Sequence, residues 1–219
     1  MLIAAAPPAV LRLAQRVESQ EQGVVLFRLH RVFDVHAGPM HRHDDLQLAV
    51  VSEDNHIVKV RVLSALVGGK MQDAARIRQI EDQYEHPKPG DVFHRPFDPA
   101  FLDEYTYQVV DARTYRFSSG VRDAGHGDGT FQLDDGGNVV SYVYTPNVMP
   151  QYATSGTVTD ERTQVLPNLW QLTREVWTFH GHYAIFGGGA TATITYDSFE
   201  RYADLISAEA ALDKATPKT

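Results

Sequence analysis

The stretch that decides the fold is residues 24–36, Val-Val-Leu-Phe-Arg-Leu-His-Arg-Val-Phe-Asp-Val-His, in which apolar and polar side chains alternate. The odd positions carry most of the apolar side chains: Val25, Phe27, Leu29, Phe33 and Val35. A period of two over 13 residues predicts one β-strand. At about 3.3 Å per residue it would be about 43 Å long, against a usual length of about 5–6 residues. Such a strand favours a strongly curved antiparallel sheet over a small sandwich.

The same alternation recurs along the chain on either side of short polar turns. Residues 46–50 and 58–62 alternate around the turn 53–55, and Asp134–Asn138 is a second hairpin turn. The glycine-rich segments 126–130 and 187–189 are also expected to be turns. Further strands are expected at residues 105–118, 129–133, 139–145, 155–159, 164–166, 169–185 and 190–201. Short turns without regular βαβ alternation predict antiparallel pairing.

Three segments have the pattern of helices. Pro7 and Pro8 suit a first helical turn, and an apolar stripe then follows at helical spacing through residues 8–20. Residues 70–85 and 204–215 are the other two predicted helices. The sequence therefore predicts an α+β, mainly β fold: a single large curved antiparallel sheet, an incomplete barrel, with helices packed over one side. We expect one domain over residues 1–219, with sheet and lid helices in 8–203 and a C-terminal helix and tail in 204–219.

The composition excludes several classes of function. The chain of 219 residues has 20 basic and 28 acidic residues, a net charge of −8, which disfavours a nucleic acid as partner. It has no cysteine, which excludes thiol catalysis and thiolate zinc sites. No run of 18 apolar residues exists, so we expect no transmembrane segment. Residues 1–7 are interpreted either as the remnant of a trimmed signal peptide or as an ordinary start before a helix.

Two H-x-H patterns raise the alternative of a metal site. His41, His43 and Asp45 form an H-x-H-x-D run, and His180 and His182 form a second pair. Two imidazoles and a carboxylate could bind zinc. However, Leu46 stands where the metallo-β-lactamase pattern continues with a histidine, and a strand rather than a helix follows. We therefore expect a polar inter-strand loop at residues 41–45 and assign no metal, no cofactor and no catalytic residue.

Large apolar side chains are concentrated on the long predicted strands. They could fill an ordinary core, or they could line an apolar cavity enclosed by a curved sheet. On the second interpretation the expected cavity-lining residues are Val25, Phe27, Leu29, Phe33, Tyr107, Phe117, Trp177 and Phe179.

The order of elements resembles a known family. An amphipathic helix, a very long first strand with two antiparallel returns, a mid-chain helix and a run of strands resemble the LolA/LolB-type lipoprotein carriers. The opening hairpins of that family are similar to residues 23–29, 45–48 and 57–60. The resemblance covers about residues 8–203 and lies in pattern and order, without a diagnostic motif. It implies an incomplete antiparallel barrel with lid helices over an apolar cavity, in proteins that carry acyl chains across the periplasm.

We therefore expect a non-enzymatic binding or carrier protein that is periplasmic or secreted, with a cytoplasmic location left open. It would hold a lipid, a lipoprotein acyl chain or another apolar ligand between sheet and helices. Two alternatives stay open at this point. One is a metal-dependent hydrolase using the H-x-H-x-D cluster, and the other is a structural or partner-binding domain with a filled core.

Overall fold

Residues 24–36 form nearly all of the strand β1 (Val24–Ala37), as the alternation predicts. The computed structural model describes residues 6–88, 92–183 and 186–217. The remaining strands within these residues are β2 (Met40–Glu53), β3 (His56–Val67), β4 (Lys70–Met71), β5 (Tyr105–Val109), β6 (Thr114–Ser119), β7 (Gly127–Leu133), β8 (Val139–Pro146), β9 (Ala153–Leu166), β10 (Leu169–Tyr183) and β11 (Phe186–Tyr202). The helical segments are α1 (Pro8–Gln20), α2 (Ala74–Glu85), the 3-10 helix η1 (Pro99–Glu104) and α3 (Leu205–Leu212).

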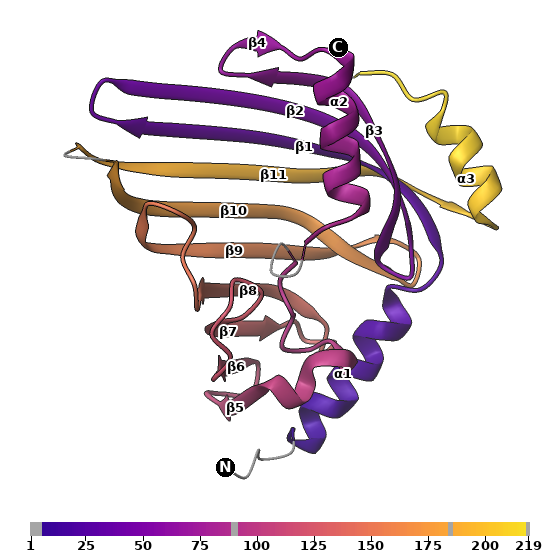
Figure 1. Ribbon diagram of the computed structural model, residues 1–219. Helices are drawn as coiled ribbons and strands as arrows, with labels where there is room; N and C mark the ends of the chain where they lie inside the picture. The colour runs from indigo at the N-terminus through magenta and orange to yellow at the C-terminus, as the bar shows by residue number, and fades with distance from the viewer. Residues whose placement is uncertain (1–5, 89–91, 184–185, 218–219) are drawn as a thin grey trace.

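All of these strands belong to one sheet. Its order is β4-β3-β2-β1-β11-β10-β9-β8-β7-β6-β5, so β1 lies beside the last strand of the chain. Every pair of neighbours is antiparallel. The end strands β4 and β5 do not pair with each other, and the sheet is therefore open rather than closed into a barrel (Figure 1). The expected α+β, mainly β class with one large antiparallel sheet is confirmed.

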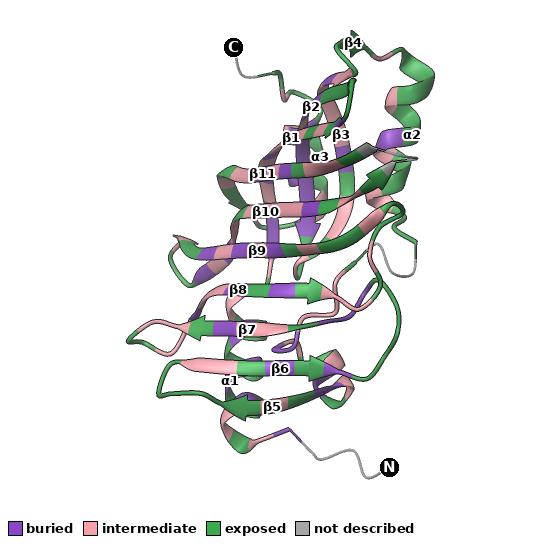
Figure 2. Ribbon diagram, turned by 90° about the vertical axis from the view of Figure 1, so that its left-hand side faces the viewer, coloured by how far each residue is buried: buried purple, intermediate pink, exposed green. Residues whose placement is uncertain are grey.

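One face of the sheet, called the inner face below, carries the odd-numbered apolar side chains of β1. Phe27 and Leu29 lie on it beside Leu48 of β2 and Ile194 of β11, and Ile80 of α2 packs against the same cluster. Burying a leucine or isoleucine side chain in such a cluster contributes about 1.5–3 kcal/mol to the stability of the fold. Successive residues of β1 therefore point alternately to this covered face and to the opposite face of the sheet. Figure 2 shows the resulting buried segments as bands along the strands.

Two carboxylates of α2 attach this helix to the edge of β3, where backbone groups have no neighbouring strand. Glu81 accepts a hydrogen bond from the Val62 backbone N–H at 2.9 Å, and Glu85 accepts one from the Val60 backbone N–H at 2.8 Å. Only the two-residue strand β4 lies beyond β3, so these N–H groups have no strand partner along most of β3. The carboxylates of α2 therefore protect an edge that could otherwise pair with another chain.

The two other helices cover different parts of the sheet. Leu13 and Val17 of α1 belong to an aromatic cluster with Phe97 and Phe131, at the β5–β8 end of the sheet. The helix α3 packs instead on the face opposite α2, where Ala208 lies in a small cluster with its neighbours on β1 and β2. The helices thus occupy both faces, with α3 on the outer one (Figure 1).

The predicted strand 105–118 was wrong, because the chain reverses in its middle. The strand β5 ends at Val109 and β6 begins at Thr114. Between them the Asp111 carboxylate accepts hydrogen bonds from the backbone N–H groups of Arg113 and Thr114, both at 2.8 Å. An aspartate that bonds its own backbone two and three residues later stabilises a tight turn. Asp111 and Arg113 therefore lie in a turn rather than on the strand face of Tyr107.

Two predicted glycine turns were also wrong, because these glycines lie within strands. Gly187, Gly188 and Gly189 belong to β11, and a Cβ at Gly188 would lie 2.1 Å from the His36 carbonyl oxygen. Residues 127–130 open β7, where a Cβ at Gly129 would lie 2.0 Å from the Val143 carbonyl oxygen. These glycines allow neighbouring backbones to approach closely. Residues 184 and 185, which join β10 to β11, lie outside the described residues.

Smaller boundary errors have local causes. The helix predicted from residue 70 begins at Ala74, because Asp73 caps it by accepting hydrogen bonds from the N–H groups of Ala75 and Arg76. The two short strands predicted at 155–159 and 164–166 form one strand, β9. The prediction of a single domain stays a prediction.

A buried ion cluster joins α1, the connection after α2 and the sheet. Glu21 caps the C-terminus of α1, and both of its carboxylate oxygens accept hydrogen bonds from Arg95, at 2.6 and 2.8 Å. Arg162 of β9 contacts the same carboxylate at 2.7 Å. The Phe97 ring lies 5.5 and 5.6 Å from the two guanidinium carbons. Burial opposes the charge of Glu21, but the guanidinium groups of Arg162 and Arg95 outweigh it and lower the pKa of Glu21.

Replacing Glu21 should destabilise the fold strongly. Glu21→Ala leaves two buried guanidinium groups without their anion, and breaking a buried pair in this way costs about 3–5 kcal/mol. Urea denaturation at pH 7 measures this loss directly. The matched control is Glu18→Ala, an exposed glutamate of the same helix, which should change stability by about 0.5 kcal/mol or less. Equal effects of the two substitutions would contradict a structural role for the ion cluster.

Candidate functional site: an apolar pocket at one end of the inner face

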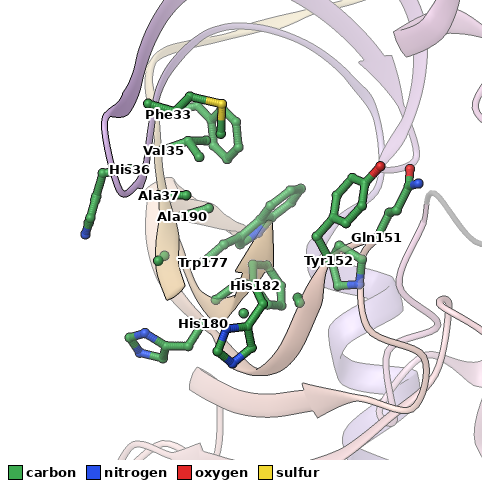
Figure 3. Close-up of a pocket in the computed structure, with 17 residues that line it drawn as sticks. Phe33, Val35, His36, Ala37, Gln151, Tyr152, Trp177, His180, His182 and Ala190 are labelled. Carbon is green, nitrogen blue, oxygen red and sulfur yellow. The ribbon is translucent and has the colours of Figure 1, made fainter. Parts of the chain in front are cut away.

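An apolar pocket lies at the end of the inner face where the β1–β2 and β10–β11 pairs end (Figure 3). Its volume is about 310 Å³. It is lined by Phe33, Val35, His36, Ala37, Met40, Pro150, Gln151, Tyr152, Ala153, Trp177, Phe179, His180, Gly181, His182, Gly188, Gly189 and Ala190. The strands therefore supply one wall, and the loop 147–152 between β8 and β9 supplies the other.

The hollow exists because small and large residues alternate across neighbouring strands. Ala192 of β11 is the Cα partner of both Phe33 of β1 and Trp177 of β10. Ala190, two residues away on the same face, also lies between larger residues of β1 and β10, and it lines the pocket. Methyl groups between bulky neighbours leave volume that the sheet alone cannot fill. Figure 3 shows the Trp177 ring between Ala190 and Tyr152 of the loop.

A glycine in β9 sets the position of one pocket wall. A Cβ at Gly156 would lie 2.1 Å from Cδ1 of Phe179, so the Phe179 ring occupies the space above this glycine. The ring also lies edge-on to Trp177, with centroids 6.5 Å apart and an interplanar angle of 74°. Such edge-to-face contacts are favourable for aromatic pairs. The wall is therefore pre-formed by packing within the sheet.

The structure separates the eight predicted cavity residues into three groups. Phe33, Trp177 and Phe179 line the pocket. Val25, Phe27 and Leu29 lie on the same face of β1 but are buried in the cluster beneath α2. Phe117 and Tyr107 lie at the other end of the sheet, where the Tyr107 hydroxyl donates to the Pro96 carbonyl at 2.5 Å. Ligand binding by any of the eight stays a prediction.

Sequence reasoning missed the second wall of the pocket. Met40 and residues 150–152 line it, and they lie in or next to turns where no periodicity indicates which way a side chain points. The turn glycine Gly38 is the sequence feature that could have marked the first turn, whereas the positive φ of Tyr152, 71°, is visible only in the structure. Neither feature shows that the two turns face each other.

Two buried carboxyl groups lie on the inner face next to the pocket walls. Asp160 of β9 and Glu175 of β10 are Cα partners, two residues along their strands from Val158 and Trp177. Burial raises the pKa of Asp160 to about 7, although hydrogen bonds from Tyr142 and Glu175 lower it. Burial and then the charge of Asp160 raise the pKa of Glu175 well above its usual value. Burial therefore favours the protonated form of both groups, which share a side-chain hydrogen bond.

The structure does not bring together the five residues of the alternative metal site. His41, His43 and Asp45 lie within β2 rather than in a loop, and so the loop prediction for residues 41–45 was wrong. Their partners are on β1: Nδ1 of His43 is 2.7 Å from the Asp34 carboxylate, and Oδ2 of Asp45 is 3.1 Å from Nε2 of His30.

The other two histidines of that alternative lie elsewhere. His180 and His182 are exposed at the rim of the pocket on β10. Within the described residues, the five side chains form no group of three ligand atoms within 4.8 Å of one another. The extended pairing of β1 with β2 explains part of the difference, because it places His43 directly opposite Asp34 of the neighbouring strand.

The chain matches no protein-family model and no curated protein sequence. It is similar to the crystal structure of a LolA superfamily protein from Nitrosomonas europaea, with 9% identity, 93% of this chain and 97% of that chain covered, and a TM-score of 0.38. A putative outer membrane lipoprotein-sorting protein domain from Vibrio parahaemolyticus is similar at 10% identity over 93% of this chain and 98% of that chain, with a TM-score of 0.45. A DUF1329 family protein from Desulfovibrio piger is similar at 11% identity over 92% and 95% of the two chains, with a TM-score of 0.41.

One of these structures is a LolA superfamily protein, the group that the order of elements resembles. Each of the three similarities extends over more than nine-tenths of this chain. Among the described helices, none has both the length and the apolar character needed to cross a membrane.

The buried carboxyl pair predicts that stability falls as pH rises. In the unfolded chain these groups ionise near pH 3.9 and 4.3, whereas in the fold the pKa of Asp160 is raised to about 7 and that of Glu175 is raised well above its usual value. The folded state therefore binds more protons between about pH 4 and 7, so the pair lowers the free energy of unfolding across this window as pH rises. Each unit by which a pKa is raised contributes about 1.4 kcal/mol to this fall.

Glu175→Gln should remove part of this dependence while keeping the shape and the hydrogen-bond donor. Urea denaturation at pH 5 and pH 8 should show a smaller loss of stability in this variant than in the natural protein. Glu161→Gln is the control, because Glu161 neighbours Asp160 in β9 but is half-exposed and pairs with Arg174. An unchanged difference between pH 5 and pH 8 in Glu175→Gln would show that the carboxyl pair does not hold its protons.

Proposed function

We propose that the protein is a non-enzymatic carrier that binds an apolar ligand, such as a lipid or a lipoprotein acyl chain, in the pocket at the end of the inner face. The observation that carries the proposal is the pocket itself, whose walls are made mainly by apolar side chains such as Trp177, Phe33 and Phe179. Its volume of about 310 Å³ lies at the lower end of the range of about 300–1,000 Å³ for small-molecule sites. This size suits one alkyl chain or one apolar group.

Affinity for such a ligand would come from withdrawing alkyl carbon from water. Each buried methylene contributes about 0.8 kcal/mol. The walls are pre-formed, because Phe179 is placed by Gly156 and the alanines of β11 are fixed by their pairing. A pre-formed site loses little affinity to ordering on binding. The polar side chains at the rim, Gln151, His180 and His182, would face the polar end of the ligand.

Of the two lid helices expected from the sequence, α2 is the one that could move to enlarge the site. Among its residues Ile80 is buried, whereas α1 buries Val10, Leu13, Ala14 and Val17. Tyr84 also packs against the inner-face cluster, Glu85 pairs with Lys59, and Glu81 and Glu85 accept hydrogen bonds from backbone groups of β3. Movement of α2 away from β3 would uncover the apolar cluster around Phe27 and Leu29, which continues the inner face beyond the pocket. We place the protein in the periplasm or outside the cell as part of the same proposal.

Filling the pocket should abolish ligand binding. In Ala190→Phe a benzyl group would enter the pocket beside Trp177, whereas Thr191→Phe adds the same group one residue later on the exposed opposite face. Titration with the fluorescent fatty acid 11-(dansylamino)undecanoic acid should show saturable binding to the natural protein and to Thr191→Phe. Affinity for Ala190→Phe should fall at least 10-fold.

Two outcomes would contradict the carrier function. One is absence of saturable binding of the dansyl fatty acid together with absence of extractable lipid in native mass spectrometry of the purified protein. The other is equal affinity of the two phenylalanine variants, which would show that the probe binds elsewhere. Far-ultraviolet circular dichroism of both variants checks that the sheet is intact.

A further inference from the structure

A second cluster of chemically active side chains lies away from the pocket, where the connection after α2 meets the start of β7. It contains His94 from that connection, Glu104 at the end of η1, and His126 immediately before β7. Nδ1 of His94 lies 3.0 Å from Oε2 of Glu104, and Nε2 of His126 lies 2.7 Å from the same oxygen. One nitrogen from each ring and one carboxylate oxygen lie within 4.8 Å of one another.

We propose that His94, Glu104 and His126 form a binding site for a divalent transition metal, with Zn²⁺ as the best match. Two imidazoles and one carboxylate are a donor set that zinc uses in proteins, with a fourth position left for water or another ligand. In a tetrahedral site with bonds of about 2.0–2.2 Å, neighbouring ligand atoms lie about 3.3–3.6 Å apart. The present separations of 2.7 and 3.0 Å would therefore have to widen by about 0.3–0.9 Å, a shift that side-chain rotation can supply.

A fourth residue supports His126 in the way that metal sites require. Nδ1 of His126, the nitrogen that faces away from Glu104, lies 2.6 Å from Oδ1 of Asp123. Metal-binding histidines commonly donate their second N–H to a carboxylate, which fixes the ring orientation and makes the ligating nitrogen more basic. His126 is almost completely buried, with 3% of its side chain exposed, so its ring cannot turn freely to another partner.

The second imidazole is held by packing and by the backbone. The His94 ring stacks on Phe101, with centroids 3.9 Å apart. Its backbone N–H donates to the Gly125 carbonyl at 2.8 Å, which joins the two segments next to the site. The His94 and His126 rings meet at 69° with centroids 4.6 Å apart, an arrangement in which their nitrogens converge on one point without stacking.

The site is accessible and would have a structural consequence. The side chains of His94 and Glu104 are 28% and 36% exposed, so an ion could enter from solvent. The three ligands come from three separate segments, and a bound ion would tie the irregular connection after α2 to the sheet. Because an ion that binds only the folded state stabilises it, zinc should raise the melting temperature. This inference does not rest on the carrier function, since none of the three ligands lines the pocket.

Cobalt titration of the full-length protein, freed of metal with EDTA, tests the site. Co²⁺ bound by two imidazoles and a carboxylate gives visible d–d absorption, and Zn²⁺ should displace it at a 1:1 ratio. His126→Ala and His94→Ala should each lose the absorption and weaken Co²⁺ binding by at least 10-fold. The matched control is His43→Ala, which removes an exposed histidine that also pairs with an aspartate.

Asp123→Asn is the second variant, and it serves also if His126→Ala does not fold. It leaves all three ligands in place and should weaken metal binding by about 10–100-fold. Zinc should raise the melting temperature of the natural protein and of His43→Ala by several degrees, and should leave that of His126→Ala unchanged. The proposal is overturned if Co²⁺ gives no d–d absorption, or if His43→Ala loses as much affinity as His126→Ala.

Discussion

The buried carboxylate of Glu21 is the interaction on which the arrangement of the other elements depends. It accepts hydrogen bonds from Arg95 and contacts Arg162, and these residues belong to the end of α1, to the connection after α2 and to the strand β9. Removing three charges from water is costly, and only close mutual contact offsets that cost. The three charged side chains must therefore all be held in contact at the same time. It holds α1 and the connection against the inner face of the sheet.

The sheet divides into a filled part and a hollow part according to the sizes of residues on neighbouring strands. Beneath α2, Phe27 and Leu29 meet other large apolar side chains and form a closed core. Farther along the same face, the alanines of β11 lie between Phe33 and Trp177, and no helix covers them. The same face thus supports packing at one place and an apolar pocket at another. The difference is made by two methyl-sized positions and by the absence of a cover in the described part of the chain.

Polar groups in this protein take different roles according to their surroundings. On β1 and β2 two histidines each contact an aspartate of the adjacent strand, His43 with Asp34 and His30 with Asp45. Asp160 and Glu175 lie on the inner face, where burial raises the pKa of both. His126 is buried against two carboxylates from different segments. Residue type alone could not separate these cases, because the separation depends on burial and on partners distant in sequence.

The amino-acid sequence by itself determined the long first strand, the antiparallel pairing and the amphipathic α1, because these depend on side-chain period and on turn chemistry within a few residues. It also indicated three of the pocket residues, Phe33, Trp177 and Phe179, since alternation assigns them to one face. Only the tertiary structure decided that the glycines of β11 and β7 serve close backbone approach rather than turns. It alone decided the second pocket wall, the Glu21 ion cluster and the convergence of His94, Glu104 and His126. These features join segments that lie between 10 and 141 residues apart, from His94–Glu104 to Glu21–Arg162, and no local pattern records which distant segments meet.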